Sequence, residues 1–167
     1  TFPVGAYSID RIGALTHVRG QVTRVAESGG RFVEAAYECQ RCGTMTYTPD
    51  GREPHECQGC ERQGPWAIQL SQSELIDHQL VRLQRPPEQS RTGARDATLD
   101  VSLEGDLVGS LSPGDRVTAA TILDGEIDNE DEGTVSIRGH ANNVEQQETT
   151  YEDLDIDAYE DEIRRIA

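Results

Sequence analysis

Four cysteines, the only ones in the chain, restrict its fold more than any other sequence feature. They form two C-x-x-C pairs with fourteen residues between them, and the four positions are Cys39, Cys42, Cys57 and Cys60. Each pair can form a tight turn that directs both sulfurs at one tetrahedral ion, which is the spacing of a structural zinc ribbon. The sequence therefore predicts a Zn²⁺ site with four cysteine ligands, in a ribbon at about residues 37–66.

Three other roles for these residues are weighed against the zinc site. Disulfides are disfavoured because the sequence shows no secretory signal segment and no other extracellular mark. A redox dithiol would be expected to begin a helix after a strand, whereas turn residues follow here. His55 can in principle replace one sulfur, but four cysteines already complete the ligand shell.

The charge of the chain is strongly acidic and unevenly distributed. Its 31 acidic and 15 basic residues give a net charge of −16, and every basic residue is arginine. A lysine-free acidic surface is what we expect in a cytosol at molar salt, so we infer a halophilic archaeal source. Residues 1–116 have a net charge of −4 and residues 117–167 of −12, so any polyanion partner is expected to contact the first part.

Length and hydropathy predict a small protein without a membrane span. The 167 residues suffice for one domain with its own core and a small metal-stabilised lobe. No apolar run approaches the roughly 18 residues that a span requires. We expect a soluble, cytoplasmic protein. Because the chain begins at Thr1 and ends within a helical pattern, we also expect it to be part of a longer protein.

The hydrophobic pattern is typical of short strands. Alternating or β-branched segments occur at residues 15–25, 32–38, 66–70, 75–84 and 98–103. Gly29 and Gly30 are expected to form a turn, and residues 116–123 and 134–138 are expected to form a hairpin around an acidic tip at 124–133. Residues 1–13 have no clear period and are interpreted as a linker with one short turn. Five or six strands without a convincing long helix predict a small all-β barrel with the zinc lobe inserted.

Catalytic patterns are not found in the sequence. It contains no phosphate-binding GxxxxGK[ST] loop, no GxSxG elbow and no HExxH helix. The four histidines are scattered, and acidic pairs such as Asp128 and Asp131 are typical of a solvated face. We therefore do not expect enzymatic activity in this chain itself.

Several segments together resemble one known family. VRGQVTRV, AYECQRCG, CQGC, SELIDHQLVRLQRPPE, VSLEGDLVGSLSPGDRVTAATI and the acidic end YEDLDIDAYEDEIRRIA occur in this order. In that order they resemble the N-terminal region of archaeal minichromosome maintenance (MCM) replicative helicases, from about residue 9 to 167. The most specific parts are Asp77, Gln79, Gln84 and Pro87-Glu88, with the DLV and PGDRV segments of 106–117.

The resemblance implies a fold and a set of partners. It implies a mainly β protein: a five-stranded OB-fold barrel at residues 14–148, with the zinc ribbon inserted. It also implies a homo-oligomeric ring, a hexamer, that encircles DNA ahead of an ATPase motor. Residues 149–167 would then be an acidic linker toward the ATPase domain. The loop beginning at Arg85, Pro86, Pro87 and Glu88 would contact the motor of the neighbouring subunit, and a hairpin at about 122–138 would project into the channel.

The sequence departs from the family pattern at the channel hairpin. Between Leu123 and Gly133 there are six acidic residues and no arginine, so this tip is expected to repel phosphates. The candidate DNA surface is therefore where arginine locally outnumbers acid, with Phe32, Tyr37 or Trp66 offering stacking faces for single-stranded bases. The alternative is that these arginines only pair with carboxylates and these aromatic residues only fill a small core. The candidate DNA-binding residues are Arg24, Arg31, Arg82, Arg91 and Arg95.

Three functions remain open from the sequence. The first is the non-catalytic, DNA-binding and ring-forming N-terminal module of an MCM helicase. The second is a stand-alone OB and zinc-ribbon protein that binds single-stranded DNA or acts as an adaptor without a motor. The third is a zinc-stabilised interaction domain without nucleic-acid contact, which the net charge of −16 favours.

Overall fold

The fold is described from a computed structural model that covers residues 1–85, 97–129 and 133–147. Within these ranges the chain consists of strands and short 3-10 helices. The strands are β1 (Phe2–Pro3), β2 (Leu15–Val25), β3 (Gly29–Cys39), β4 (Met45–Pro49), β5 (Trp66–Ile68), β6 (Glu74–Gln84), β7 (Thr98–Glu104), β8 (Arg116–Asn129) and β9 (Thr134–Gln146). The 3-10 helices are η1 (Ile9–Arg11), η2 (Leu70–Gln72) and η4 (Gly105–Leu107), and none of them has the length and hydrophobicity of a membrane span.

Five of the strands close into a barrel. β2 pairs with β8, β8 with β9, β9 with β7, β7 with β6, and β6 returns to β2. Only the β7–β9 pairing within this circuit is parallel. The predicted mainly β class and the five-stranded OB-fold barrel are confirmed.

The barrel core follows from the alternation of each strand. In β7 the side chains of Leu99, Val101 and Leu103 point inward and are at most 1% exposed, while Asp100 and Glu104 alternate with them on the outer face. Successive side chains of a strand point to opposite faces, so one strand supplies both core and surface. The core consists of Val4, Val18, Val22, Val81, Leu83, Leu99, Val101, Leu103, Leu111, Val117, Ala119 and Leu123.

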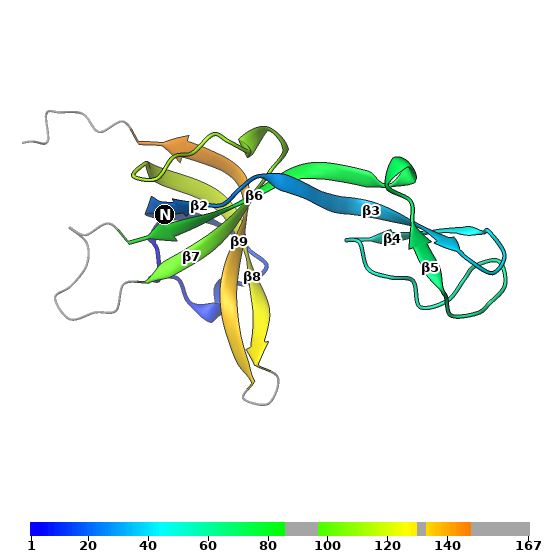
Figure 1. Ribbon diagram of the computed structural model, residues 1–167. Helices are drawn as coiled ribbons and strands as arrows, with labels where there is room; N and C mark the ends of the chain where they lie inside the picture. Colours follow the sequence, from blue (N-terminus) through cyan, green and yellow to red (C-terminus); the bar gives the residue numbers. More distant parts are fainter. Residues whose placement is uncertain (86–96, 130–132, 148–167) are drawn as a thin grey trace, which may run out of the picture.

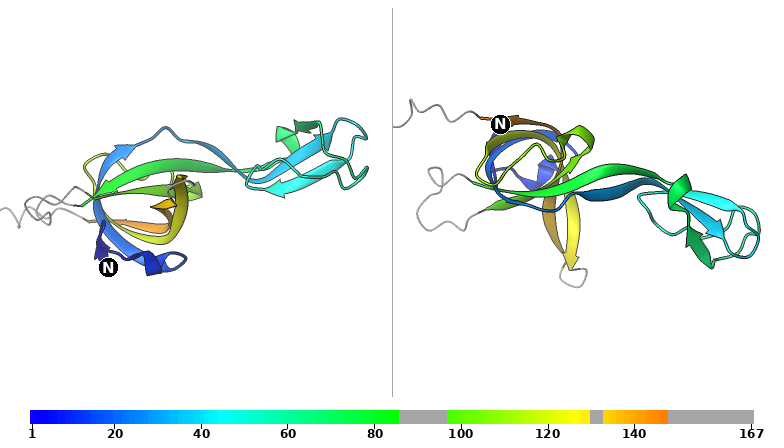
Figure 2. Two further views of the ribbon diagram at one scale, coloured as in Figure 1. Left: turned by 90° about the horizontal axis from the view of Figure 1, so that it is seen from below. Right: turned by 45° about the horizontal axis from the view of Figure 1, so that its top comes forward.

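The lobe that contains the four cysteines lies at the end of a two-stranded arm. The first half of β3 pairs with the first half of β6, and the second half of β3 pairs with β4 and β5. Figure 1 shows this arm leaving the barrel and ending in the lobe. The two views of Figure 2 show the same separation from other directions, so the lobe is an extension of the barrel sheet and not a layer over its core.

The predicted hairpin is longer than expected. β8 continues to Asn129 and β9 to Gln146, and their outer part projects away from the barrel (Figure 1). The acidic residues at the start of the predicted tip are therefore strand residues: Asp124 pairs with Arg138 and Glu126 with Ser136. A ribbon exposed on both faces does not need alternating apolar residues. Its acidic sequence therefore lacks the pattern from which a strand is predicted.

Two segments near the N-terminus differ from the sequence-based expectation. The start of this segment packs on the barrel: Phe2 pairs with Val18 in a parallel ladder, and Val4 is completely buried in the core. A two-residue strand is too short to show a period, which is why the pattern indicated a linker. Gly29 and Gly30 begin β3, and the connection from β2 lies at residues 26–28.

Candidate functional site

The four cysteines come together at the end of the lobe. Their Sγ atoms all lie within 4.8 Å of one another, with 3.8 Å between Cys39 and Cys60 and 3.5 Å between Cys42 and Cys57. Four sulfurs placed about 2.3 Å from a central ion in a tetrahedron lie about 3.8 Å apart. The donor set therefore fits one tetrahedral metal ion.

Two turns of the same construction position the sulfurs. In the first, the N–H of Gly43 donates to the carbonyl of Cys39 at 2.8 Å, and in the second the N–H of Glu61 donates to the carbonyl of Cys57 at 2.9 Å. The residue after each second cysteine has a positive φ, +73° at Gly43 and +56° at Glu61. Glycine adopts this conformation without strain, whereas glutamate does so at a cost. The two C-x-x-C pairs are thus related turns that face each other.

Gly59 and Thr44 form the contact between the two turns. A Cβ atom at Gly59 would lie 2.2 Å from Thr44 Oγ1, so the space between the turns excludes any side chain there. The Thr44 hydroxyl also lies 3.3 Å from Cys42 Sγ. Hydrogen bonds from the Thr44 side chain and backbone lower the pKa of Cys42 to about 6. A lowered pKa favours the thiolate, which is the form that binds a metal.

Replacing Gly59 with alanine should weaken metal binding about 10- to 100-fold, the usual cost of disturbing a residue that supports a ligand. The added methyl group must displace Thr44 and with it the hydrogen bond to Cys42. Competition with a chromophoric chelator measures the affinity. Gln58→Ala, an exposed neighbour in the same turn, is the control. Equal affinities for the two variants would contradict this account of Gly59.

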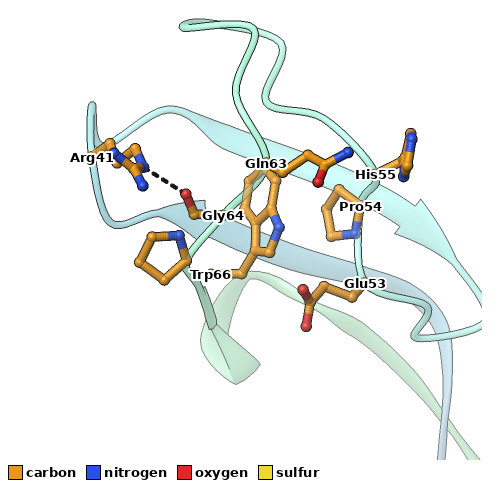
Figure 3. Close-up of a pocket in the computed structure, with 8 residues that line it drawn as sticks. Arg41, Glu53, Pro54, His55, Gln63, Gly64 and Trp66 are labelled. Atoms are coloured by element: carbon orange, nitrogen blue, oxygen red, sulfur yellow. Dashed lines mark hydrogen bonds between the residues drawn. The ribbon is translucent and has the colours of Figure 1, made fainter.

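His55 does not join the cysteine group. It is exposed and lines an open cavity of about 510 Å³ on the lobe, together with Arg41, Pro54 and Trp66. Figure 3 shows the indole of Trp66 between Arg41 and Gly64 on one side and Pro54 and His55 on the other. Arg41 Nε donates to the Gly64 carbonyl at 2.7 Å, which fixes that wall. The expected bystander role of His55 agrees with this position.

Of the three predicted stacking faces, Trp66 lines the cavity just described. Phe32 packs against Gly51, where an added Cβ would lie 2.8 Å from the ring. The Tyr37 hydroxyl donates to the carbonyl of the same Gly51 at 2.7 Å. Phe32 and Tyr37, both on β3, therefore hold the turn that follows β4, and Trp66 is the aromatic residue best placed for an external ligand.

Arginines from different strands meet on the outer face of the barrel. Arg24 on β2 pairs in register with Arg82 on β6, Arg82 with Asp100 on β7, and Asp100 with Arg138 on β9. We call this set of four residues the arginine row. Neighbouring strands lie about 4.8 Å apart, so the row places three cations across four strands. Two of them, Arg24 and Arg82, were predicted from local charge, and the structure brings them together.

Asp100 holds the arginine row together. Its two carboxylate oxygens accept hydrogen bonds from Arg82 Nε at 2.6 Å and from Arg82 Nη2 at 2.8 Å. This bidentate bond from Arg82 is the main cause of a lowered pKa at Asp100, with Arg138 and Arg24 adding charge attraction and burial opposing it. Like charges directly opposite one another in a sheet are unfavourable. Asp100 therefore makes the Arg24 and Arg82 pair compatible with a stable barrel.

Replacing Arg82 with glutamine should change stability in a pH-dependent way. Because folding lowers the pKa of Asp100 below its ordinary value of 3.8, the ion pair stabilises the fold above that value. This contribution is lost as the pH falls through the lowered pKa. Thermal unfolding of the wild type and of Arg82→Gln should therefore differ by a modest amount near neutral pH and converge in acid. A difference that persists or grows in acid would contradict the role of Asp100.

The other predicted site residues lie apart from the arginine row or outside the described residues. Arg31 on β3 lies beside the row, 2.7 Å from Glu104. Arg85 Nε donates to the Val4 carbonyl at 3.0 Å, so it binds the N-terminal segment. Five predicted residues fall in the part of the chain that the structure does not describe: Pro86, Pro87, Glu88, Arg91 and Arg95.

Residues that the sequence analysis did not identify complete this face. Ser102 and His140 lie side by side in β7 and β9, and Arg138 contacts Glu126 across the base of the hairpin. The alternation of residues 98–103 predicted the strand but did not single out Ser102, which is only 6% exposed. The parallel pairing of β7 with β9 joins residues more than 35 positions apart, and no local pattern encodes it.

The chain was compared with known proteins. A family model described as the MCM OB domain matches residues 7–125. DNA replication licensing factor mcm6 of Schizosaccharomyces pombe is 34% identical over 120 residues, which cover 68% of this chain and 14% of that protein. DNA replication licensing factor mcm7 of Xenopus tropicalis is 32% identical over 123 residues, which cover 68% of this chain and 17% of that protein. The chain thus spans less than a fifth of the length of these relatives.

A solved structure gives the same result at the level of the fold. The crystal structure of the N-terminal domain of an archaeal MCM superposes with a TM-score of 0.71 at 26% identity, and the match covers 87% of this chain and 61% of that chain. Since the family model covers well over half of the sequence and the solved domain shares the fold, this chain belongs to the MCM family, whose OB domain matches residues 7–125.

Proposed function

We propose that this chain is the DNA-binding and ring-forming N-terminal module of an MCM replicative helicase. In this proposal six copies form a ring around DNA, preferably single-stranded. The ATPase domain of the full-length protein performs the catalysis, and this chain is not itself the enzyme. The loop that begins at Arg85, Pro86, Pro87 and Glu88 would contact that motor. The protein would act in the cytoplasm, at the nucleoid.

The observation that carries the proposal is the arginine row. In a chain with a net charge of −16, three arginines from three strands meet on one face of the barrel. A positive stripe that crosses an OB barrel is suited to the backbone of a single strand, and Trp66 offers a stacking face on the lobe. The acidic hairpin is a poor DNA-binding surface, because Asp124 and Glu126 would repel phosphates. This also favours the arginine row as the surface that binds DNA.

We further propose that the metal is zinc and that its role is structural. Four thiolates complete a closed tetrahedral shell, which leaves no open position for a substrate. The ion would connect the two cysteine turns in a lobe that contributes no residue to the barrel core.

The lysine-free acidic surface also supports a halophilic archaeal source for the protein. At molar salt the Debye length is about 3 Å, so phosphate contacts would weaken, and stacking would contribute a larger share of the binding.

Assembly and DNA binding can be tested on the same sample. In sedimentation velocity at near-molar KCl, the zinc-loaded chain should form a species of six copies, favoured by a labelled oligothymidine. Fluorescence anisotropy should show binding of that oligonucleotide, and its affinity should fall in the variant Arg24→Gln/Arg82→Gln. Arg52→Gln, which removes one positive charge from the lobe, is the control. A chain that neither assembles nor binds the oligonucleotide would be an interaction domain without nucleic-acid contact.

A further inference from the structure

A small cavity opens on the outer face of the barrel, next to the arginine row. It has a volume of about 160 Å³ and is formed by β3, β6, β7 and β9. Most of the residues that line it have charged or polar side chains: Arg31, His78, Asp100, Ser102, Arg138 and His140. Strands far apart in the sequence thus contribute two arginines and two histidines to one cavity.

Two buried donors in this cavity lack a partner. Ser102 is only 6% exposed, and its Oγ has no hydrogen-bond partner among the described residues. The same holds for Arg31 Nε, whose atom is buried. Buried polar groups in folded proteins are almost always hydrogen-bonded, and an arginine N–H can only donate. An acceptor that enters the cavity from outside can satisfy Ser102 Oγ and Arg31 Nε.

The arginines at the cavity are held loosely. Arg31 Nη2 lies 2.7 Å from Glu104 Oε1, yet this oxygen makes no hydrogen bond, so the contact is an attraction of charges without aligned geometry. Arg138 contacts Glu126, and both side chains are about half exposed. The Arg138 pair is solvent-exposed and contributes little to stability, so the Arg138 guanidinium can turn toward an anion. Arg31 has a buried Nε without an acceptor and can donate it to the same anion.

The permanent charges around the cavity cancel, so the charge state of the two histidines decides the net charge of its surroundings. His140 Nε2 lies 4.0 Å from Asp124 Oδ2, and a histidine changes charge between about pH 5 and 8. With both histidines neutral, four arginines face four carboxylates; with both protonated, the surroundings are positive. The charged and titratable groups are Arg24 (β2), Arg31 (β3), His78 and Arg82 (β6), Asp100 and Glu104 (β7), Asp124 and Glu126 (β8), and Arg138 and His140 (β9).

We propose that this cavity binds one phosphate group, held by Ser102 Oγ and the guanidinium groups of Arg31 and Arg138, and that protonation of His78 and His140 strengthens the binding. The phosphate is either a phosphodiester of the DNA backbone or a free phosphate ion. Only the DNA source rests on the proposed function. The cavity would add a pH-sensitive contact to a surface whose other cations have a constant charge.

The first experiment uses inorganic phosphate and the zinc-loaded chain at about pH 6, where histidines are partly protonated. Phosphate should shift the amide NMR signals of Ser102, Gly139 and His140 in a saturable way. Ser102→Ala and Arg138→Gln should each lower the affinity about tenfold, the size expected for a hydrogen bond to a charged group. Arg52→Gln should leave it unchanged. Absence of saturable shifts, or an equal loss in Arg52→Gln, would overturn the proposal.

The second experiment uses an oligothymidine, whose phosphodiesters keep one charge over the range studied. Its affinity for the wild type should rise several-fold from about pH 8 to about pH 5.5, and the variant His78→Gln/His140→Gln should lose most of this rise. An equal rise in both proteins would overturn the role of the histidines. Thermal unfolding of each variant verifies that it is folded.

Competition between the two ligands identifies the source of the phosphate. If the oligonucleotide reverses the shifts that inorganic phosphate causes, the natural ligand is the DNA backbone. If phosphate remains bound while DNA binds, the cavity holds a free phosphate. A chain that binds phosphate at Ser102 but never binds DNA would refute the proposed function and leave the phosphate site intact.

Discussion

Replacing Cys57 with serine should abolish metal binding and unfold the lobe, while the barrel stays folded. A structural zinc contributes on the order of 10 kcal/mol of apparent binding free energy, which is enough to decide whether so small a lobe folds. Cys57 is buried, and its Sγ lies 3.5 Å from that of Cys42 and accepts a hydrogen bond from the Gly59 N–H at 3.3 Å. A serine hydroxyl is a poor replacement for a thiolate in this shell.

The lobe and the barrel can be monitored separately in this variant. Amide NMR signals of Thr46 and Trp66 report on the lobe, and those of Val101 and Leu103 report on the barrel. Metal content is measured by atomic absorption, and Gln58→Ser in the same turn is the control. Lobe signals that remain dispersed in a metal-free Cys57→Ser protein would show that the ion is not what holds the lobe together.

Replacing Leu103 with alanine should destabilise the barrel and leave the lobe largely unchanged, the reverse of the effect of Cys57→Ser. Leu103 is completely buried in β7, so the change should lower the free energy of unfolding of the barrel by about 2 to 5 kcal/mol through lost burial and a residual cavity. Its neighbours Ser102 and Glu104 lie on the outer face, so the arginine row and the phosphate cavity should loosen with the barrel. Metal affinity of the lobe should change little.

Denaturant unfolding measures the effect of Leu103→Ala. Leu70→Ala, at a side chain that is 61% exposed in η2, removes the same atoms from the surface and should cost less than about 1 kcal/mol. Comparable losses for the two variants would contradict the placement of the barrel core.

The parts of the fold that the sequence predicted are those encoded by local patterns. The two C-x-x-C pairs define their own turns, and the alternation of Leu99, Val101 and Leu103 identifies a strand with one buried face. Pro86 and Pro87 indicated the end of the preceding strand correctly, because β6 ends at Gln84. Such features need no knowledge of the partner strand.

The parts that were missed depend on distant partners. Val4 is buried because β2 and β6 provide its surroundings, where an added Cβ at Gly20 would lie 2.9 Å from Val4 Cγ2. The acidic start of the hairpin was read as a loop because a two-stranded ribbon in solvent shows no apolar alternation. The candidate site was predicted only in part for the same reason: Arg24 and Arg82 stand out by local charge, whereas Arg138 joins them through the β7 and β9 pairing.

The salt dependence of oligothymidine binding tests most directly whether the arginine row binds DNA. The logarithm of the association constant should fall linearly with the logarithm of the KCl concentration, with a slope of about −0.7 for each phosphate contact to a single strand. Arg24→Gln/Arg82→Gln should bind more weakly and reduce the magnitude of this slope by about 1.4, while Arg52→Gln should keep the wild-type slope. The same slope for the wild type and for Arg24→Gln/Arg82→Gln would contradict the proposal that the arginine row contacts the DNA backbone.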